Sequence, residues 1–371
     1  MTIGIDCRLW NETGVGRYIR NLVEQLVKQN SEHRFILFVL KKDVEKIENK
    51  NLGKFVKLAV ADIRWHSIEE QLLLPEILRK ENVDLMHFPY FSVPILYSKP
   101  FVVTIHDLIL NHYQTGEATT HNPLLYNLKR QGYKYIIQQA ANKARAIITV
   151  SHATQEEIVD HLRVSKEKIF VTYEGVDEQL KNTNIKKAIQ IKKFFLHVGN
   201  VYPHKNVDRL LRAFIIFLKT NADVKIVFVG KEDFFFNKLK AKVKLLGLSK
   251  SVVFAGLVSD EALVAYYDQA IAVVVPSLME GFGLPAIEAM AQNCLVLASD
   301  IPSLREVCEH VALYFDPLNE NDIAKCMEKA LQLPIAKKNE LMREGKKKIT
   351  HYSWQEMAQE TITIYESCID I

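Results

Sequence analysis

The chain has 371 residues, and this length exceeds what one hydrophobic core usually serves, so we expect two domains. Hydrophobic residues make up 48% and charged residues 25%, which is typical of a globular protein and excludes a disordered chain. The net charge of +4 is too small and too dispersed for a nucleic-acid-binding face, so no nucleic acid partner is expected.

The first half alternates short apolar runs with amphipathic segments, which is typical of a doubly wound parallel sheet. Residues 16–29 repeat apolar side chains at helical spacing, so we expect a helix there. The expected strands are Ile3–Asp6, Arg34–Leu40, Leu85–Phe88, Phe101–Ile105, Ala146–Val150 and Ile169–Thr172.

The second half repeats this pattern after the polar stretch Asp177–Lys193, which we expect to be a linker between domains. The expected strands are Phe194–Val198, Val224–Val229, Val252–Ala255, Ile271–Val275 and Leu295–Ala298. Helical segments are expected at Val207–Leu218, Glu261–Asp268 and Ala286–Ala291. Two similar α/β halves predict a cleft between two domains.

The segment from Glu280 to Glu288 joins a glycine turn, a helix start and two carboxylates eight residues apart. Gly281 and Gly283 let backbone N–H groups approach a phosphate, and the positive end of a helix beginning at Pro285 favours the phosphate charge. Glu288 is expected in the first turn of this helix. One carboxylate can bind ribose hydroxyls while the other faces a sugar, so the segment predicts a sugar-nucleotide site. Ordinary carboxylates at a helix end are the alternative.

This arrangement resembles the signature of the retaining glycosyltransferases of family 4, which are two-domain enzymes with the GT-B fold. Other segments in the family's order are Thr13–Tyr18, Thr104–Asp107, Val150–Ser151, Tyr173–Asp177, His197–Asn200, Pro203–Asn206 and Tyr352–Trp354. The resemblance covers nearly the whole chain and implies two Rossmann-like, doubly wound parallel-sheet domains that face a cleft. It places an acceptor-side domain at residues 1–180 and a nucleotide-sugar-binding domain at residues 190–350. The last helix, residues 354–371, is implied to pack back onto the first domain.

The resemblance also implies which residues bind the donor. Lys205 matches the lysine that contacts the donor phosphate, where leaving-group charge grows as the bond to the anomeric carbon breaks. Many relatives have a second cation near this loop, whereas this chain has Asn200 and His204 there. His204 could replace part of that charge when protonated, given an ordinary pKa of about 6.5. The implied donor-binding residues are Gly16, Gly199, Asn200, His204, Lys205, Gly281, Phe282, Gly283, Leu284 and Glu288.

Catalytic roles are implied for His106, Glu280 and Lys205. The family's histidine at the position of His106 hydrogen-bonds the transferred sugar, and Glu280 is implied to orient the sugar and stabilise charge. The family is thought to react by front-face substitution, in which the departing phosphate helps to deprotonate the acceptor. The chain has no Asp-x-Asp segment, so we expect no metal, and no cofactor is expected besides the nucleotide sugar as co-substrate.

The resemblance therefore implies a retaining hexosyltransferase whose partners are a nucleotide sugar and a glycan or lipid-linked acceptor. Similarity to bacterial polysaccharide mannosyltransferases favours mannose from GDP-mannose. A UDP-sugar-dependent glucosyltransferase and a degenerate sugar-nucleotide-binding protein without transferase activity are the alternatives.

Location is indicated by missing features and by two basic clusters. The N-terminus lacks the pattern of a signal peptide, no apolar stretch reaches the ~18 residues that span a bilayer, and the five cysteines are scattered, so we expect a cytoplasmic protein. The basic clusters could contact an anionic membrane at its inner face, or they could be solvated surfaces. They are Lys129, Arg130, Lys134, Lys143 and Arg145, and Lys186, Lys187, Lys192 and Lys193.

Overall fold

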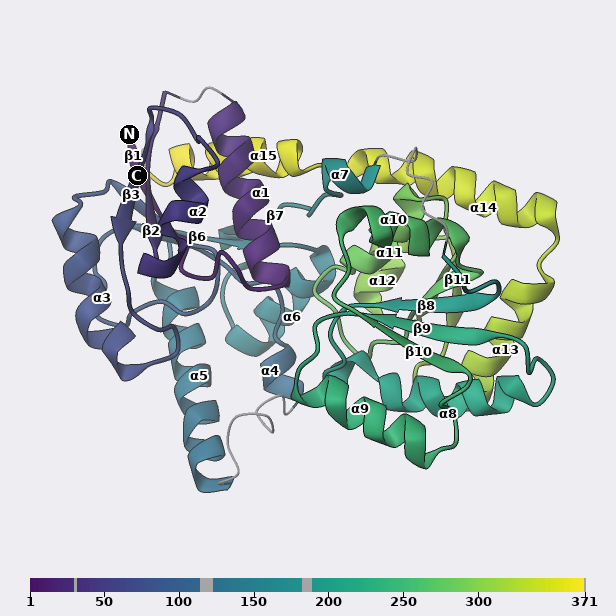
Figure 1. The fold of residues 1–371 in the computed structure, drawn as a ribbon. Helices are drawn as coiled ribbons and strands as arrows, with labels where there is room; N and C mark the ends of the chain where they lie inside the picture. The colour runs from purple at the N-terminus through teal and green to yellow at the C-terminus, as the bar shows by residue number, and fades with distance from the viewer. Residues whose placement is uncertain (30–31, 114–122, 182–188, 370–371) are drawn as a thin grey trace. The chain divides into compact units, whose positions relative to one another are not determined.

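The computed structural model describes residues 1–29, 32–113, 123–181 and 189–369. The chain divides into two compact units (Figure 1). Unit 1 comprises residues 1–108, 122–174 and 354–371, and unit 2 comprises residues 109–121 and 175–353. Each unit contains one parallel β-sheet with helices, which confirms the expected α/β class with two doubly wound sheets.

The sheet of unit 1 has seven parallel strands in the order β3-β2-β1-β4-β5-β6-β7. The strands are β1 (Thr2–Asp6), β2 (Arg34–Val39), β3 (Val56–Val60), β4 (Leu85–Phe88), β5 (Phe101–Thr104), β6 (Ala146–Thr149) and β7 (Ile169–Val171). From β1 the chain builds outward to β3 and then returns to place β4 beside β1. These two strands therefore mark the topological switch point, where open α/β sheets bind ligands at the carboxyl ends of their strands.

Unit 1 has helices α1 (Gly14–Lys28), α2 (Val44–Glu48), α3 (Ile68–Lys80), α5 (Pro123–Lys143), α6 (His152–Leu162) and α15 (Trp354–Ser367), and 3-10 turns at Lys41–Asp43 and Lys166–Lys168. Helix α1 is amphipathic and buries one face, including Tyr18 and Leu22. Its neighbour is α15, since the rings of Tyr18 and Trp354 meet edge-on with centroids 6.3 Å apart. The C-terminal helix therefore packs on the first helix of the chain.

A buried polar chain fixes α15 to the sheet of unit 1. His87 on β4 is fully buried, and its Nδ1 lies 2.5 Å from the Tyr365 hydroxyl of α15. Its Nε2 lies 2.8 Å from the Thr104 hydroxyl at the end of β5. Burial, assisted by the nearby His106, lowers the pKa of His87 to about 3, so its imidazole stays neutral. His87 therefore holds the core together and has no accessible charge for catalysis.

The sheet of unit 2 has six parallel strands in the order β10-β9-β8-β11-β12-β13. They are β8 (Phe194–Val198), β9 (Lys225–Val229), β10 (Val252–Gly256), β11 (Ala272–Val275), β12 (Val296–Ser299) and β13 (Ala312–Phe315). Here β8 and β11 mark the switch point, because the chain builds outward from β8 in one direction and from β11 in the other.

The helices of unit 2 are α4 (Ile109–His112), α7 (Glu178–Lys181), α8 (Val207–Leu218), α9 (Phe234–Leu245), α10 (Asp260–Gln269), α11 (Leu284–Ala291), α12 (Pro302–Cys308), α13 (Glu320–Gln332) and α14 (Ile335–Lys348). Short 3-10 turns lie at Pro203–Lys205 and Ile349–His351. The core of the unit combines the phenylalanines of α8 and β9 with the apolar strands β11 and β12.

Three features differ from the sequence expectations. Strands β3 and β13 were not expected, and both are edge strands. Strand β3 shows a weak apolar pattern because most of its side chains are partly or fully exposed. The predicted linker Asp177–Lys193 begins as helix α7, because Leu180 is buried and the Gln292 side chain donates to its carbonyl oxygen.

Among the helices of the described ranges, none is long and apolar enough to cross a membrane.

Candidate active site

The loops that follow β8 and β11 meet at the switch point of unit 2, as the order of the strands requires. The 3-10 turn Pro203–Lys205 ends at Asn206, whose φ of 56° is left-handed. The Asn206 side-chain amide donates to the carbonyl oxygens of Pro276 (3.0 Å) and Pro317 (2.7 Å). The Leu278 N–H also donates to the His204 carbonyl oxygen at 2.7 Å. The loop that carries Lys205 is therefore held firmly against the loop that carries Glu280.

Lys205 and Glu280 form a direct ion pair in this place. The Lys205 Nζ lies 2.7 Å from Oε1 and 2.9 Å from Oε2 of Glu280. The two side chains are only 16% and 8% exposed. The Ser277 hydroxyl, which is fully buried, donates to Oε1 of Glu280 at 2.6 Å. Both carboxylate oxygens therefore have a cationic partner, and one also has a neutral donor.

The Glu280 carboxylate is ionised despite its burial. Burial alone raises its pKa, but the Lys205 charge and the hydrogen bonds from Lys205 and Ser277 outweigh that effect, so the pKa lies below its ordinary value. Glu280 is therefore an anion at neutral pH, and it neutralises the Lys205 charge.

Glu288 lies deeper in unit 2 than the sequence suggests. Helix α11 begins at Leu284, so Pro285 is its second residue and Glu288 its fifth, in the second turn rather than the first. The carboxylate is 2% exposed, and its Oε2 accepts a hydrogen bond of 2.7 Å from the buried Tyr267 hydroxyl of α10. The expected first-turn position is wrong because the helix begins at Leu284, one residue before the expected start at Pro285.

The turn before α11 is tightly constrained. Gly283 has a φ of 114°, and a Cβ at this position would lie 2.7 Å from the Leu304 side chain, so glycine is required. The Phe282 side chain is buried and meets the Tyr352 ring edge-on, with centroids 5.3 Å apart. Within this turn, Phe282 therefore contributes packing, and the Gly283 carbonyl oxygen accepts from the N–H groups of Ala286 and Ile287. The start of α11 at Leu284 contributes the positive end of the helix dipole.

The loop after β8 contains two buried polar atoms without a hydrogen-bond partner in the described structure. They are Asn200 Oδ1 and His204 Nδ1. Burial, with a smaller effect of the Lys205 charge, lowers the pKa of His204 to about 4. His204 is therefore a neutral imidazole at pH 7 in this structure and adds no second cation beside Lys205. Its contact with the donor stays a prediction. Gly199, with a φ of 126°, lets this loop turn beside Gly230, where a Cβ would lie 2.1 Å from the Gly199 carbonyl oxygen.

Gly16 lies in unit 1, as the third residue of α1. A Cβ on Gly16 would lie 2.6 Å from the Leu9 carbonyl oxygen and 2.7 Å from that of Trp10. At Gly14 no atom lies within 4 Å of such a Cβ. The absence of a side chain at Gly16 therefore serves the close approach of the loop after β1. A contact between the Gly16 N–H and the donor stays a prediction.

His106 follows β5 in unit 1, where both of its ring nitrogens face protein acceptors. Its Nε2 lies 3.0 Å from the Pro89 carbonyl oxygen, and its Nδ1 lies 3.6 Å from Glu174 Oε1. The ring of Tyr18 meets the imidazole edge-on at 4.7 Å. The side chains of His106 and Glu174 are 11% and 8% exposed. His106 is thus held in place by the protein itself.

Sequence reasoning missed three polar side chains, Ser277, Glu174 and Tyr267, that face carboxylate or imidazole groups of predicted site residues. Ser277 precedes Glu280 by three residues on the same loop, and Glu174 lies in a segment that carries the family resemblance, so both had a local signal. Tyr267 had none, because only the packing of α10 on unit 2 brings its hydroxyl to Glu288.

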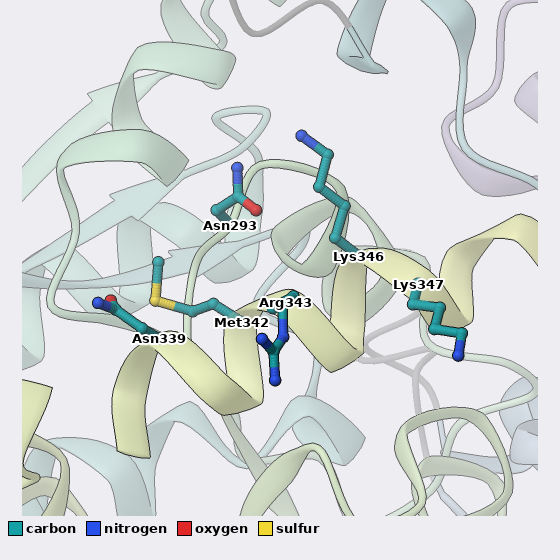
Figure 2. A pocket seen from close by; sticks show the side chains of 6 residues that line it. All are labelled: Asn293, Asn339, Met342, Arg343, Lys346 and Lys347. Carbon is teal, nitrogen blue, oxygen red and sulfur yellow. The ribbon is translucent and has the colours of Figure 1, made fainter. Parts of the chain in front are cut away.

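A separate hollow of about 410 Å³ lies in unit 2 along α14. Its lining residues are Asn293, Asn339, Met342, Arg343, Lys346 and Lys347. Figure 2 shows Lys346 and Arg343 pointing in opposite directions from the helix, so their charges do not converge on one point. None of the predicted site residues lines this hollow, which therefore belongs to a solvated basic face of α14.

Comparisons with known proteins agree with this architecture. The family model for glycosyltransferase family 4 matches residues 13–180, and the model for glycosyl transferases group 1 matches residues 179–349. The O-antigen chain mannosyltransferase RfbU of Salmonella typhimurium is 29% identical over 272 residues, which are 73% of this chain and 72% of RfbU. The MMP alpha-(1->4)-mannosyltransferase of Mycolicibacterium hassiacum is 29% identical over 283 residues, which are 73% of this chain and 66% of that enzyme.

Among solved structures, HepE of Anabaena in complex with UDP and glucose superposes with a TM-score of 0.76. The alignment covers 99% of this chain and all of HepE at 17% identity, so it supports the GT-B fold alone. The two family models together span residues 13–349, and the resemblance seen in the sequence is thereby confirmed. The chain belongs to glycosyltransferase family 4, and it is a GT-B glycosyltransferase whose homologues include bacterial mannosyltransferases.

Proposed function

We propose that this glycosyltransferase moves mannose from GDP-mannose to a glycan or lipid-linked acceptor with retention of the anomeric configuration. The observation that carries the proposal is the Lys205–Glu280 ion pair at the switch point of unit 2, beside the start of α11. This place combines a cation, a carboxylate and the start of a helix, whose dipole favours the charge of a sugar diphosphate.

In this proposal Lys205 and the backbone N–H groups around Gly281–Leu284 bind the donor diphosphate. The unpartnered Asn200 Oδ1 and His204 Nδ1 support a ligand in the same loop, because buried polar atoms normally have a partner. Asn200 Oδ1 can accept there from a hydroxyl or amine of the nucleotide sugar, whereas Nδ1 of neutral His204 can accept from such a group or, as the other tautomer, donate to a phosphate oxygen. Lysine and N–H groups meet the phosphate charge, so the proposal needs no metal and no cofactor besides the nucleotide sugar.

The carboxylates have separate roles. Glu288 accepts hydrogen bonds from the ribose, with Tyr267 fixing one of its oxygens at 2.7 Å. Glu280 acts on the transferred sugar as an orienting and charge-stabilising group. His106 of unit 1 serves the same sugar, as the family resemblance implies, with its ring orientation fixed by Pro89 and Glu174.

The donor is the part of the proposal that rests most on the relatives. Both reported relatives are named mannosyltransferases, which favours GDP-mannose. The HepE structure holds UDP and glucose, and UDP-glucose is therefore the second candidate donor. A thermal-shift screen with GDP, UDP and ADP sugars separates them, because the bound donor raises the melting temperature. We expect the largest shift with GDP-mannose, and a shift with UDP-glucose alone would favour the second candidate.

Retention and metal independence can be tested in one experiment. An α-linked nucleotide sugar should give an α-glycoside, and EDTA should not abolish the reaction. NMR of the anomeric proton of the product, recorded with and without EDTA, measures both. A β-glycoside would contradict retention, whereas activity that requires a divalent cation would contradict only the account of the leaving group.

We extend the proposal to contact between α5 of unit 1 and an anionic membrane surface. Helix α5 exposes Leu128 (70%) and Tyr135 (55%), and Lys134 between them is also exposed. Apolar and cationic side chains together suit a membrane interface. In the second predicted cluster, Lys186 and Lys187 lie outside the described residues.

Sedimentation with vesicles that contain anionic lipid tests this contact. Lys134→Glu should reduce the bound fraction, because it reverses a charge at the interface. Lys57→Glu is the comparison variant, since Lys57 pairs with Glu81 on an exposed surface of the same unit, outside both predicted clusters. Equal binding by the wild type and Lys134→Glu would contradict a role of this helix.

A further inference from the structure

We propose that Glu280 competes with the donor diphosphate for Lys205, so that donor binding transfers the Lys205 ammonium from the carboxylate to the phosphate. The inference rests on the proposed function, since it takes the ligand of this loop to be a nucleoside diphosphate. It adds a role to Glu280 that is separate from contact with the sugar.

The geometry shows that the charge of Lys205 is already neutralised without a ligand. Its Nζ contacts both Glu280 oxygens, at 2.7 and 2.9 Å, with the two side chains 16% and 8% exposed. Burial of such a pair is tolerated because each charge balances the other. Because Glu280 holds the ammonium through both of its oxygens, a diphosphate that enters this loop gains the full charge of Lys205 only by displacing Glu280.

The basic side chains nearest to Lys205 in the chain do not supply the diphosphate with another positive charge. His204 is neutral, because its pKa is lowered to about 4. The guanidinium of Arg209 donates to the Asn206 side-chain oxygen at 2.9 Å and thus supports the loop itself. The affinity for the diphosphate consequently depends on how easily Lys205 leaves Glu280.

The exchange conserves charge-assisted hydrogen bonds, and no covalent bond forms or breaks. Carboxylate and phosphate oxygens both accept from an ammonium, so Lys205 trades N–H···O contacts with Glu280 for equivalent contacts with phosphate. Ser277 continues to donate to Oε1 of Glu280 at 2.6 Å. Oε2 then becomes available to a sugar hydroxyl. After transfer, the carboxylate takes back Lys205 and favours release of the nucleoside diphosphate.

Calorimetry with GDP and UDP tests the inference on the full chain. Glu280→Gln should bind the preferred diphosphate roughly tenfold more tightly, because the amide has no charge with which to hold Lys205. Ser277→Ala removes the donor that stays on Glu280 after Lys205 leaves, so it should hold Lys205 more tightly on the carboxylate and weaken binding of the diphosphate by a smaller factor. Glu280→Gln should strengthen binding of the intact nucleotide sugar less than that of the diphosphate, because it also weakens the contact with the sugar.

Two further variants separate the possible outcomes. Glu309→Gln removes a carboxylate that pairs with Lys348 at 2.7 Å elsewhere in unit 2, and should leave the affinity unchanged. In a Lys205→Ala background, Glu280→Gln should no longer tighten binding. Unchanged or weaker binding by Glu280→Gln, with weaker binding by Lys205→Ala, would overturn this inference and leave the diphosphate site intact. Unchanged binding by Lys205→Ala would overturn the diphosphate site and the inference together.

Discussion

The two units hold their candidate residues in opposite ways. In unit 2, the Lys205 ammonium and the Glu280 carboxylate satisfy each other at 2.7 Å. In unit 1, the His106 nitrogens face the Pro89 carbonyl oxygen and the Glu174 carboxylate. The unit 2 contacts can be exchanged for contacts with an anionic ligand, whereas those of unit 1 keep a side chain in one orientation. We therefore expect ligand affinity to depend on unit 2 and the fixed geometry of His106 to depend on unit 1.

The largest effect should come from Lys205. Lys205→Ala removes the ammonium that the proposal places on the leaving diphosphate, so the rate of transfer should fall by about 10²–10³-fold. Steady-state kinetics with the preferred donor measures this loss. Lys193→Ala is the control, because Lys193 pairs with Asp223 at 2.7 Å on an exposed surface of the same unit. Similar rates of transfer for Lys205→Ala and Lys193→Ala would contradict the expectation that binding of the donor depends on the Lys205–Glu280 pair of unit 2.

The pH dependence of stability should reveal the buried neutral His204. Its pKa is about 4 in the folded protein and about 6.5 when unfolded, so the unfolded chain alone takes up a proton between these values. The contribution to stability is complete above pH 6.5 and falls as the pH drops towards 4, by on the order of 3 kcal/mol.

Denaturant unfolding at several pH values measures that loss. His204→Phe should make the free energy of unfolding less dependent on pH in this window. His310→Phe should not, because the His310 side chain is 70% exposed. An unchanged pH dependence in His204→Phe would mean that folding does not lower the pKa of His204, and would contradict its buried neutral state.

The ribose contact should depend on Glu288 and, through it, on Tyr267. Glu288→Gln should weaken binding of the nucleoside diphosphate by roughly ten- to a hundredfold, which corresponds to about 1.5–3 kcal/mol. Tyr267→Phe should cause a smaller loss, which should appear in the KM for the donor rather than in kcat. Tyr266→Phe is the matched control, since Tyr266 packs edge-on against Phe194. Calorimetry that finds equal affinities for the Tyr266 and Tyr267 variants would reject the positioning role.

The smallest effect concerns the glycines at the start of α1 in unit 1. Gly16→Ala should lower the free energy of unfolding by about 1–3 kcal/mol, because its Cβ would meet two backbone carbonyl oxygens. Gly14→Ala should change it by less than about 0.5 kcal/mol, since that Cβ meets no atom within 4 Å. Thermal unfolding of both variants tests this difference. Equal stabilities of the two variants would contradict the packing role of Gly16.

The fold was largely predictable, because buried parallel strands are continuous apolar runs. Central strands such as β8 and β11 were expected within a residue of their observed bounds, whereas the edge strand β3 is half exposed and lacks that signal. The approach of the loops after β8 and β11 follows from strand order. Motifs alone could not place the ion pair, since the position of Lys205 is set by Asn206, which bridges Pro276 and Pro317.

Protonation states and distant partners also escaped prediction. His204 has the residue type of a phosphate-binding group, but its charge depends on burial that only the packed loop creates. The Tyr267 hydroxyl reaches Glu288 from another helix, 21 positions away in the chain. Short motifs therefore identify candidate residues, while tertiary packing decides which of them carry charge.

The central claim is that Lys205 of unit 2 receives the donor diphosphate, and a comparison of diphosphate with monophosphate tests it most directly. Calorimetry should compare GDP with GMP, and UDP with UMP, on the wild type and on Lys205→Ala. The account predicts that the wild type binds the preferred diphosphate more tightly than its monophosphate and that this advantage is largely lost in Lys205→Ala. An equal advantage in both proteins would show that the outer phosphate is bound elsewhere and would contradict the account.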